Sequence, residues 1–302
     1  MKNITLKDGD IICFLGDSIT ANGLWMAEVY QVLRKEYRIK CYNCGVAGAS
    51  AYCALEYLQS ECLRYNPDYV CVMFGMNDIN RLLYADSIEK TIEIRQQKQE
   101  AIQCCINSYE QILKEIKNSG AVAIICIPTP YDEVSDSPEI NLKCQSGLDE
   151  LSTLLLELAI KYDSPVVNFQ ATMQPILGKR LIISPDRVHP TEEGYHVMAQ
   201  TFLWTIGVSD GLAFDGAFVF EDWNRARYEA EKKLELTNLV EYCIFNSERR
   251  QRLCFEEKKK IALKNLEEID DGNSLMACAY REYLERIDKR AQLIDEVDKL
   301  TL

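Results

Sequence analysis

Short apolar runs alternate, over the first two thirds of the chain, with longer segments whose apolar residues recur at helical spacing. Runs of this length that end at glycine, proline or asparagine are typical of buried strands. They predict five strands, at residues 11–15, 39–42, 69–74, 122–127 and 166–169. The segments between or after them predict helices at residues 24–37, 52–65, 97–118, 147–162 and 191–204. This alternation predicts an α/β fold with a central parallel sheet and helices on both faces.

The pattern changes beyond Gly211. Residues 214–223 predict a short strand or a connecting loop, and the charge-rich, proline-free segments after them predict two or three helices. The last of these carries apolar residues at three- and four-residue steps, which form one stripe. We therefore divide the chain into a main domain, residues 1–210, and a helical C-terminal extension, residues 211–302. The stripe packs on the main domain or on neighbouring helices, or alternatively forms a homo-oligomer contact.

Composition and charge narrow the class of protein. Hydrophobic residues make up 47% and charged residues 27% of the 302 residues, which is ordinary for a soluble globular protein. The net charge of −13, without a basic stripe, argues against a nucleic-acid partner and against anionic membranes. No apolar run approaches the roughly 20 residues that a membrane span needs, and no stretch of signal-peptide length precedes the first strand.

The cysteines indicate a reducing compartment. There are 13 of them, an odd number, and many fall inside predicted strands and helices. We therefore expect free thiols and a cytoplasmic location. Cys41 and Cys44 form a single C-x-x-C pair, but no second pair or nearby histidine completes a zinc site. We interpret them as two thiols near the end of a strand.

Polar residues and glycines gather at four places where a loop follows a strand or lies at the equivalent rim. These are residues 16–18, 43–48, 75–78 and 186–190. In an open α/β sheet such loops converge at the carboxyl edge, where ligands bind. The sequence therefore predicts a functional site at this edge.

The first of these loops places Ser18 just after a strand and before a helix. The serine is a candidate nucleophile, a phosphate-loop residue or only a helix cap. Neither G-x-G-x-x-G nor a P-loop lysine follows the first strand, which argues against nucleotide binding. We expect its neighbour Asp17 to have a structural role, in holding the strand–helix turn.

A serine nucleophile needs a general base, and histidine suits this role at neutral pH. The chain has two histidines, and each follows an acidic residue by three positions. His189 follows Asp186 in a rim loop, whereas His196 follows Glu193 inside a predicted helix. We therefore assign His189 as the base, with Asp186 as the acid that orients it, and interpret His196 as structural. The Ser18 backbone N–H, a glycine-loop N–H and the Asn77 amide are candidate donors to an oxyanion.

The four motifs FLGDSIT, NCGVAG, FGMND and DRVHP resemble, in this order, the signature blocks of the SGNH hydrolases, also called the GDSL esterase/lipase family. The resemblance extends roughly over residues 10–204. It implies a three-layer α/β/α, flavodoxin-like fold and ester hydrolysis through an acyl-enzyme, with no metal or cofactor. It assigns Ser18 as nucleophile, His189 as base, Asp186 as orienting acid, and Ser18, Gly48 and Asn77 as the oxyanion hole. Ile19 stands where the family name has leucine.

The resemblance leaves several activities open. We expect an esterase that removes small acyl groups, acetyl above all, from a carbohydrate or a similar polar small molecule. A lysophospholipase or thioesterase that acts on longer chains is the alternative. We identify no exposed hydrophobic cluster in the predicted loops that favours it. A non-catalytic binding module with a helical arm is the third interpretation.

The long connection at residues 79–96 follows the third motif and contains Arg81 and Tyr84. Connections of this length without secondary structure are uncommon and often functional. We expect Arg81 and Tyr84 to shape the substrate pocket, with a plain surface excursion as the alternative.

Overall fold

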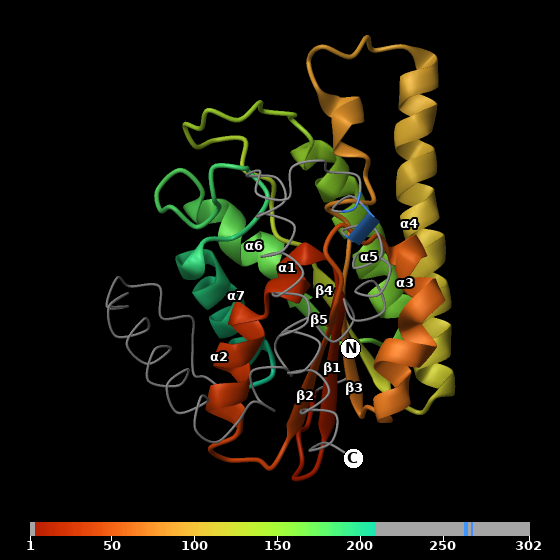
Figure 1. The fold of residues 1–302 in the computed structure, drawn as a ribbon, viewed down its shortest axis with the longest axis vertical. Coiled ribbons are helices and arrows are strands. Elements are labelled where there is room, and N and C mark those ends of the chain that lie inside the picture. The colour runs from red at the N-terminus through yellow and green to blue at the C-terminus, as the bar shows by residue number, and fades with distance from the viewer. Residues whose placement is uncertain (1–3, 209–262, 265–266, 268–302) are drawn as a thin grey trace. The chain divides into compact units, whose positions relative to one another are not determined.

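The structure, a computed structural model, describes residues 4–208, 263–264 and 267 (Figure 1). Apart from those three residues, the predicted C-terminal extension lies outside the described residues. The same holds for the predicted apolar stripe and for the homo-oligomer contact that we assigned to it. The division at residue 210 therefore stays a prediction.

Five parallel strands form the central sheet in the order β2-β1-β3-β4-β5 (Figure 1). The strands are β1 (Ile11–Gly16), β2 (Lys40–Gly45), β3 (Tyr69–Met73), β4 (Val122–Ile127) and β5 (Val166–Asn168). The strand order reverses direction between β1 and β3. In open α/β sheets, ligands bind at the carboxyl edge at such a point. The predicted parallel sheet is confirmed, and the reversal marks the ligand-binding end of this fold.

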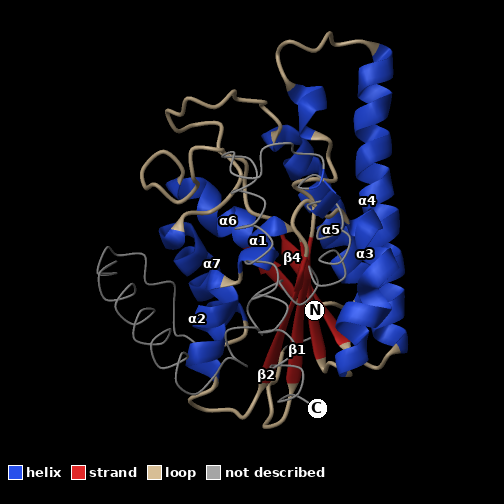
Figure 2. Cartoon of the chain, in the orientation of Figure 1, coloured by secondary structure: helices blue, strands red, loops and turns tan. Residues whose placement is uncertain are grey.

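Helices cover both faces of the sheet and make three layers (Figure 2). On one face lie α2 (Leu24–Leu33), α6 (Phe169–Met173) and α7 (Glu192–Thr205). On the other lie α3 (Ala51–Tyr57), α4 (Ile92–Asn118) and α5 (Gln145–Tyr162). The predicted α/β/α sandwich is therefore confirmed. No helix in the described part of the chain is both long enough and apolar enough to cross a membrane.

Trp25 of α2 is the centre of the core on the first face. It is almost completely buried, and its ring centroid lies 5.1 Å from that of Phe14, 5.3 Å from Phe169 and 5.7 Å from Phe202. These rings come from β1, α6 and α7, so one aromatic cluster fastens three elements to the sheet. β1, the strand that leads to Ser18, is thereby held from this side.

Several element boundaries differ from the predicted ones. β2 was predicted to end at residue 42, but its pairing with β1 continues to Gly45, opposite Gly16. α2 ends at Leu33, and residues 34–36 form turns in which the Lys35 and Glu36 N–H groups donate to the carbonyls three residues earlier, those of Val32 and Leu33. α4 begins at Ile92 and not at residue 97, because Thr91 caps it by accepting a hydrogen bond from the Ile94 N–H.

The predicted helix at residues 52–65 is helical throughout but not uniform. After α3 it continues as a π-helix, Leu58–Cys62, and a 3₁₀ turn, Leu63–Tyr65. Four further short elements were not predicted. They are the short helices α1 (Ser18–Asn22) and α6 (Phe169–Met173) and the 3₁₀ helices at Arg81–Tyr84 and Gln174–Ile176.

Candidate active site

Ser18 is the first residue of α1, directly after β1. The residue that caps this helix is Asp17, whose carboxylate accepts a hydrogen bond from the Ile19 N–H at 2.9 Å. Asp17 thus holds the strand–helix turn, as predicted, and the interpretation of Ser18 as the cap is wrong. The Ser18 side chain is left to make a different contact.

That contact is with His189, which enters from the loop before α7. Ser18 Oγ lies 2.8 Å from His189 Nε2, and His189 Nδ1 lies 2.5 Å from Asp186 Oδ2. A carboxylate can only accept, so Nδ1 carries the proton and Nε2 is left to accept the serine hydroxyl hydrogen. The serine hydroxyl therefore contacts the imidazole, and the imidazole contacts the carboxylate. This is the arrangement needed for base-assisted attack by Ser18.

The Asp186 carboxyl is held in its ionised form. Burial by itself raises its pKa, but hydrogen bonds outweigh this effect and lower the pKa to about 2. The donors are the His189 ring, the His189 and Val188 backbone N–H groups, and the Ser184 hydroxyl. At neutral pH Asp186 is thus an anion that can orient the imidazole and stabilise its protonated form.

The candidate oxyanion donors lie on the segments that follow β1, β2 and β3. Gly48 has a φ of +76°, a conformation that favours glycine, and no atom lies within 4 Å of where a Cβ would be. The Asn77 amide donates to the Ala49 carbonyl at 3.0 Å, which leaves its second N–H for another acceptor. The Ser18 N–H belongs to the first turn of α1, where backbone N–H groups have no partner within the helix.

Two buried carboxyls support these loops. Asp78 accepts a hydrogen bond from the Ala51 N–H at 2.8 Å, which ties the loop after β3 to the start of α3. Asp17 is 3% exposed, and burial raises its pKa to about 7. The charge of Asp78 makes a smaller contribution to this rise, while the hydrogen bond from the Ile19 N–H and the charges of His189 and Arg81 oppose it. Burial also raises the pKa of Asp78.

Arg81 and Tyr84 differ in their surroundings. Arg81 is half-buried, and its charge acts to lower the pKa values of Asp17, Tyr131 and Cys144. The Tyr84 ring instead packs against Gly147 of α5, where a Cβ would lie 2.3 Å from the tyrosine oxygen. The Lys98 ammonium lies 3.9 Å from the centre of the same ring. None of these contacts joins Tyr84 to Ser18 or His189.

The second histidine is held away from Ser18. His196 Nδ1 lies 2.8 Å from Glu28 Oε1 in α2, and Gln200 donates to the same oxygen. Glu193, the acid three residues earlier, is paired with Arg180 instead. His196 therefore links α7 to α2, in agreement with the structural role predicted for it.

Two residues near the site were not singled out from the sequence. The Ser184 hydroxyl donates to Asp186 Oδ1 at 2.8 Å, and its N–H donates to the His189 carbonyl, also at 2.8 Å. Arg187 lies between Asp186 and His189 and is buried. A charged residue inside the D-x-x-H motif was the one feature of the sequence that could have drawn attention to Arg187.

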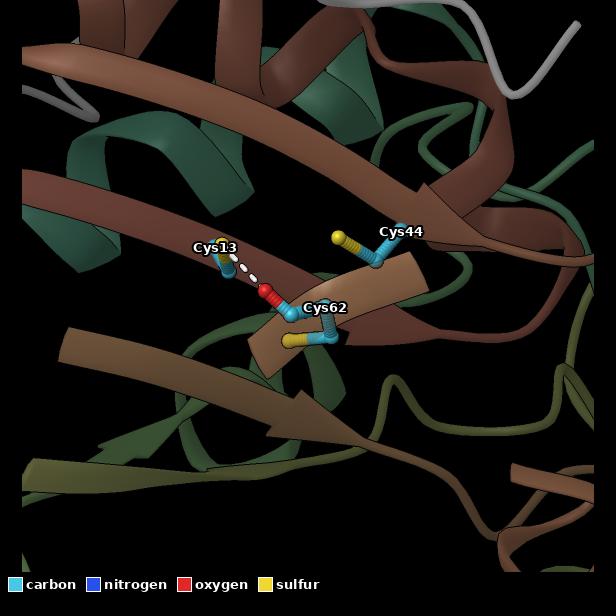
Figure 3. Close-up of side chains that lie close together, drawn as sticks. All are labelled: Cys13, Cys44 and Cys62. Carbon is cyan, nitrogen blue, oxygen red and sulfur yellow. Dashed lines mark hydrogen bonds between the residues drawn. The ribbon is translucent and has the colours of Figure 1, made fainter. Parts of the chain in front are cut away.

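Three cysteines form a cluster beneath the sheet edge, Cys13 in β1, Cys44 in β2 and Cys62 in the π-helix (Figure 3). Their sulfur atoms lie within 4.8 Å of one another, and among the residues described they are the one group of three or more potential metal ligands so close together. The Cys13 thiol donates to the Cys62 carbonyl and the Cys44 thiol to the Glu61 carbonyl. Burial raises the pKa of Cys13, so we interpret the cluster as neutral thiols packed in the core.

The chain matches the GDSL-like lipase/acylhydrolase family over residues 14–197, more than half of its length. It is 23% identical over 226 residues to an acetylxylan esterase from Geobacillus stearothermophilus, a match that covers 67% of this chain and 96% of the relative. These findings confirm the resemblance stated from the four motifs.

Solved structures with the same fold agree with this. A crystal structure of acetylxylan esterase from Geobacillus stearothermophilus matches with a TM-score of 0.57 and 22% identity, over 68% of this chain and 98% of that one. A gut microbial diltiazem-metabolising enzyme matches with a TM-score of 0.61 and 26% identity, over 67% of this chain. The match spans 48%, about half, of that enzyme. The chain belongs to the GDSL-like lipase/acylhydrolase family and is a carboxylic ester hydrolase.

Proposed function

We propose that the protein hydrolyses small acyl esters, acetyl esters above all, of a carbohydrate or similar polar molecule through a Ser18–His189–Asp186 triad. The observation that carries this proposal is the continuous contact from Ser18 Oγ to His189 Nε2 and from His189 Nδ1 to Asp186 Oδ2, at 2.8 and 2.5 Å. Family membership makes the non-catalytic binding module untenable as an alternative.

In the acylation step, Ser18 Oγ attacks the ester carbonyl carbon while its proton passes to His189 Nε2. The carbonyl oxygen becomes an oxyanion, which the Ser18 and Gly48 backbone N–H groups and the free Asn77 N–H would bind. Collapse of this intermediate breaks the bond to the alcohol, which takes the proton from Nε2 and leaves an acyl-serine. Water, deprotonated by His189, then attacks the acyl carbon and releases the carboxylic acid and free Ser18.

The relatives favour an acetylated carbohydrate as substrate. The curated relative is an acetylxylan esterase, and structures of that esterase include catalytic mutants in which a serine, an aspartate and a histidine are each replaced by alanine. In that protein the aspartate precedes the histidine by three positions, as Asp186 precedes His189 here. This shared spacing supports the same division of roles.

The net charge and the cysteines bear on the charge of the substrate and on the location of the protein. The net charge of −13 favours an uncharged or cationic small molecule over nucleic acid or an anionic membrane. Ten cysteines among the described residues are free thiols. Free thiols are compatible with the predicted cytoplasmic location.

Longer acyl chains are the second candidate, because large apolar side chains are exposed on the segments that follow β2, β3 and β4 and on the segment that precedes α7. These are Tyr52, Leu82, Val134, Ile140 and Leu181. An apolar acyl chain would gain free energy by covering such side chains, so chain length is the property to measure.

A fluorophosphonate probe is expected to label Ser18, because the probe reacts with a serine that a base activates. Peptide mapping of the labelled protein identifies the site, and Ser18→Ala is the control that should take no label. On p-nitrophenyl esters we expect kcat/KM to be at least about tenfold higher for acetate than for octanoate. The reverse preference would establish the longer-chain alternative, and a folded wild type that takes no label at Ser18 would contradict the triad.

Arg81 and Tyr84 can be separated experimentally. Replacing Arg81 with alanine should raise KM for a polar sugar ester by about tenfold and change the unfolding free energy by less than about 0.5 kcal/mol. Replacing Tyr84 with alanine removes packing on α5 and should cost about 1–2 kcal/mol of stability. Steady-state kinetics and urea unfolding measure the two effects. Unchanged kinetics on every ester tested would remove Arg81 from the substrate site.

A further inference from the structure

Arg187 is buried in a loop whose proposed catalytic residues are accessible. It is 6% exposed, whereas the side chains of Asp186 and His189 are 46% and 41% exposed. Burying a guanidinium is costly unless its donors find acceptors. Each N–H donor of the buried Arg187 guanidinium therefore needs an acceptor close by.

Its acceptors all come from residues 132–139, a segment that follows β4 and is called here the clamp segment. The guanidinium donates four hydrogen bonds to backbone carbonyls of this segment. They run from Nε to Glu139 (3.0 Å), from Nη1 to Asp132 (2.9 Å) and Ser135 (3.1 Å), and from Nη2 to Ser137 (3.3 Å). Among the described residues no carboxylate pairs with Arg187. The Arg187 side chain is thus held by hydrogen bonds to backbone carbonyls and not by an ion pair.

The backbone of the two segments is joined as well. The Asp132 N–H donates to the Arg187 carbonyl at 2.9 Å, and the Ser137 hydroxyl donates to the Pro185 carbonyl at 2.5 Å. The clamp segment is itself braced, because Asp132 Oδ1 accepts hydrogen bonds from the Val134 and Ser135 N–H groups. The loop thus rests on a surface whose carbonyls are already fixed in direction.

Arg187 also has a φ of +67°, in the left-handed region that non-glycine residues rarely adopt. Its N–H donates to the Ser184 carbonyl, which closes a tight turn just before His189. A conformation of this kind persists where its surroundings enforce it. The four side-chain hydrogen bonds to the clamp segment provide such enforcement.

We propose that Arg187 is a positioning residue for the Ser18–His189–Asp186 triad, an inference that rests on the proposed function. By fastening the turn to the clamp segment, it fixes the backbone on both sides, at Asp186 and at Val188–His189. The 2.5 Å contact between His189 and Asp186 and the 2.8 Å contact between His189 and Ser18 both depend on this backbone. A displacement of about 1 Å at reacting groups can cost about 10²-fold in rate.

The chemistry of the site requires arginine. A guanidinium presents five donors in a flat fork and can reach carbonyls that lie in several directions, whereas a lysine ammonium concentrates three donors at one point. Lysine could keep one or two of the four hydrogen bonds. It should therefore hold the turn less firmly than arginine and more firmly than alanine.

The test compares wild type with Arg187→Ala, Arg187→Lys and the control Arg180→Ala. Arg180 belongs to the same region, and its guanidinium pairs with Glu193 of α7. With p-nitrophenyl acetate, we expect kcat to fall by about 10²-fold in Arg187→Ala with KM nearly unchanged, and by an intermediate factor in Arg187→Lys. Guanidinium ion added to Arg187→Ala should restore part of kcat. Arg180→Ala should keep kcat within about threefold of wild type.

Proton NMR provides a readout that does not need activity. The proton shared by His189 Nδ1 and Asp186 should give a strongly downfield signal in wild type, which broadens or disappears in Arg187→Ala, while the second histidine serves as an internal reference. Wild-type kcat and an unchanged signal in folded Arg187→Ala would overturn the proposal. If Arg187→Ala does not fold, the same two measurements on Arg187→Lys decide between these outcomes. An inactive wild type whose downfield signal still depends on Arg187 would refute the proposed function and leave the positioning role standing.

Discussion

Replacing His189 with alanine is expected to lower kcat/KM for p-nitrophenyl acetate by on the order of 10⁴-fold or more, with the fold unchanged. Among the residues that the structure describes, the imidazole is the one group within hydrogen-bond distance of Ser18 Oγ that can take its proton, with Nε2 at 2.8 Å. Without it, Ser18 must attack as a neutral hydroxyl and the leaving alcohol must depart without a proton. Steady-state kinetics, with circular dichroism to check the fold, measure the effect.

The chain supplies a matched control for this change. His196→Gln removes the other histidine, whose ring is bonded to Glu28 between α7 and α2, and should leave kcat/KM within about threefold of wild type. Asp186→Asn should also lower kcat strongly. The amide oxygen would stay with the Val188 and His189 N–H groups, so the amide NH2 would face His189 Nδ1 and donate to it, which favours the wrong tautomer. Equal losses in His189→Ala and His196→Gln would contradict the assignment of His189 as the base.

The fold and the position of the candidate site could be predicted because both depend on local patterns. Apolar runs ending in glycine marked the strands, and parallel strands bring their carboxyl ends to one edge. Ser18, Asn77 and His189 each follow such an end or lie at the same rim, so their convergence follows from topology. Asp186 followed from its spacing to His189 within one loop.

Other features depend on contacts that no local pattern encodes. His196 and Glu193 have the same spacing as His189 and Asp186, yet His196 pairs with Glu28, which lies 168 positions away in sequence. The carbonyls that receive Arg187 come from a different loop, so an arginine in D-x-x-H does not by itself indicate burial. The continuation of β2 to Gly45 is set by its pairing with β1 and not by its own composition.

The residue that caps α1 could not be predicted from the sequence either. Serine and aspartate are both common N-caps, so the pair Asp17–Ser18 left the choice open. In the structure Asp17 caps the helix, and Ser18 contacts His189. As a consequence, a carboxyl is buried beside the proposed nucleophile, at a position where its ionisation is unfavourable.

Asp17 is therefore expected to make the protein less stable as the pH rises. Burial raises its pKa from the ordinary 3.8 to about 7, so the folded state keeps a proton that the unfolded state releases from about pH 4 upward. The stability linked to Asp17 is fully present below pH 4 and is lost as the pH rises through about 7. From the two pKa values we expect wild type to lose roughly 2–3 kcal/mol of unfolding free energy between pH 5 and pH 8 through this group.

Asp17→Asn isolates this effect, because asparagine can still accept the hydrogen bond from the Ile19 N–H but cannot ionise. Urea unfolding should show its stability relative to wild type growing by roughly 2–3 kcal/mol between pH 5 and pH 8. Asp136→Asn, which removes an exposed carboxylate, should show no such growth. A constant difference between Asp17→Asn and wild type across this range would mean that Asp17 ionises without penalty. The expected growth would instead show that the turn presenting Ser18 is kept at a cost in stability, as is common where function fixes a residue.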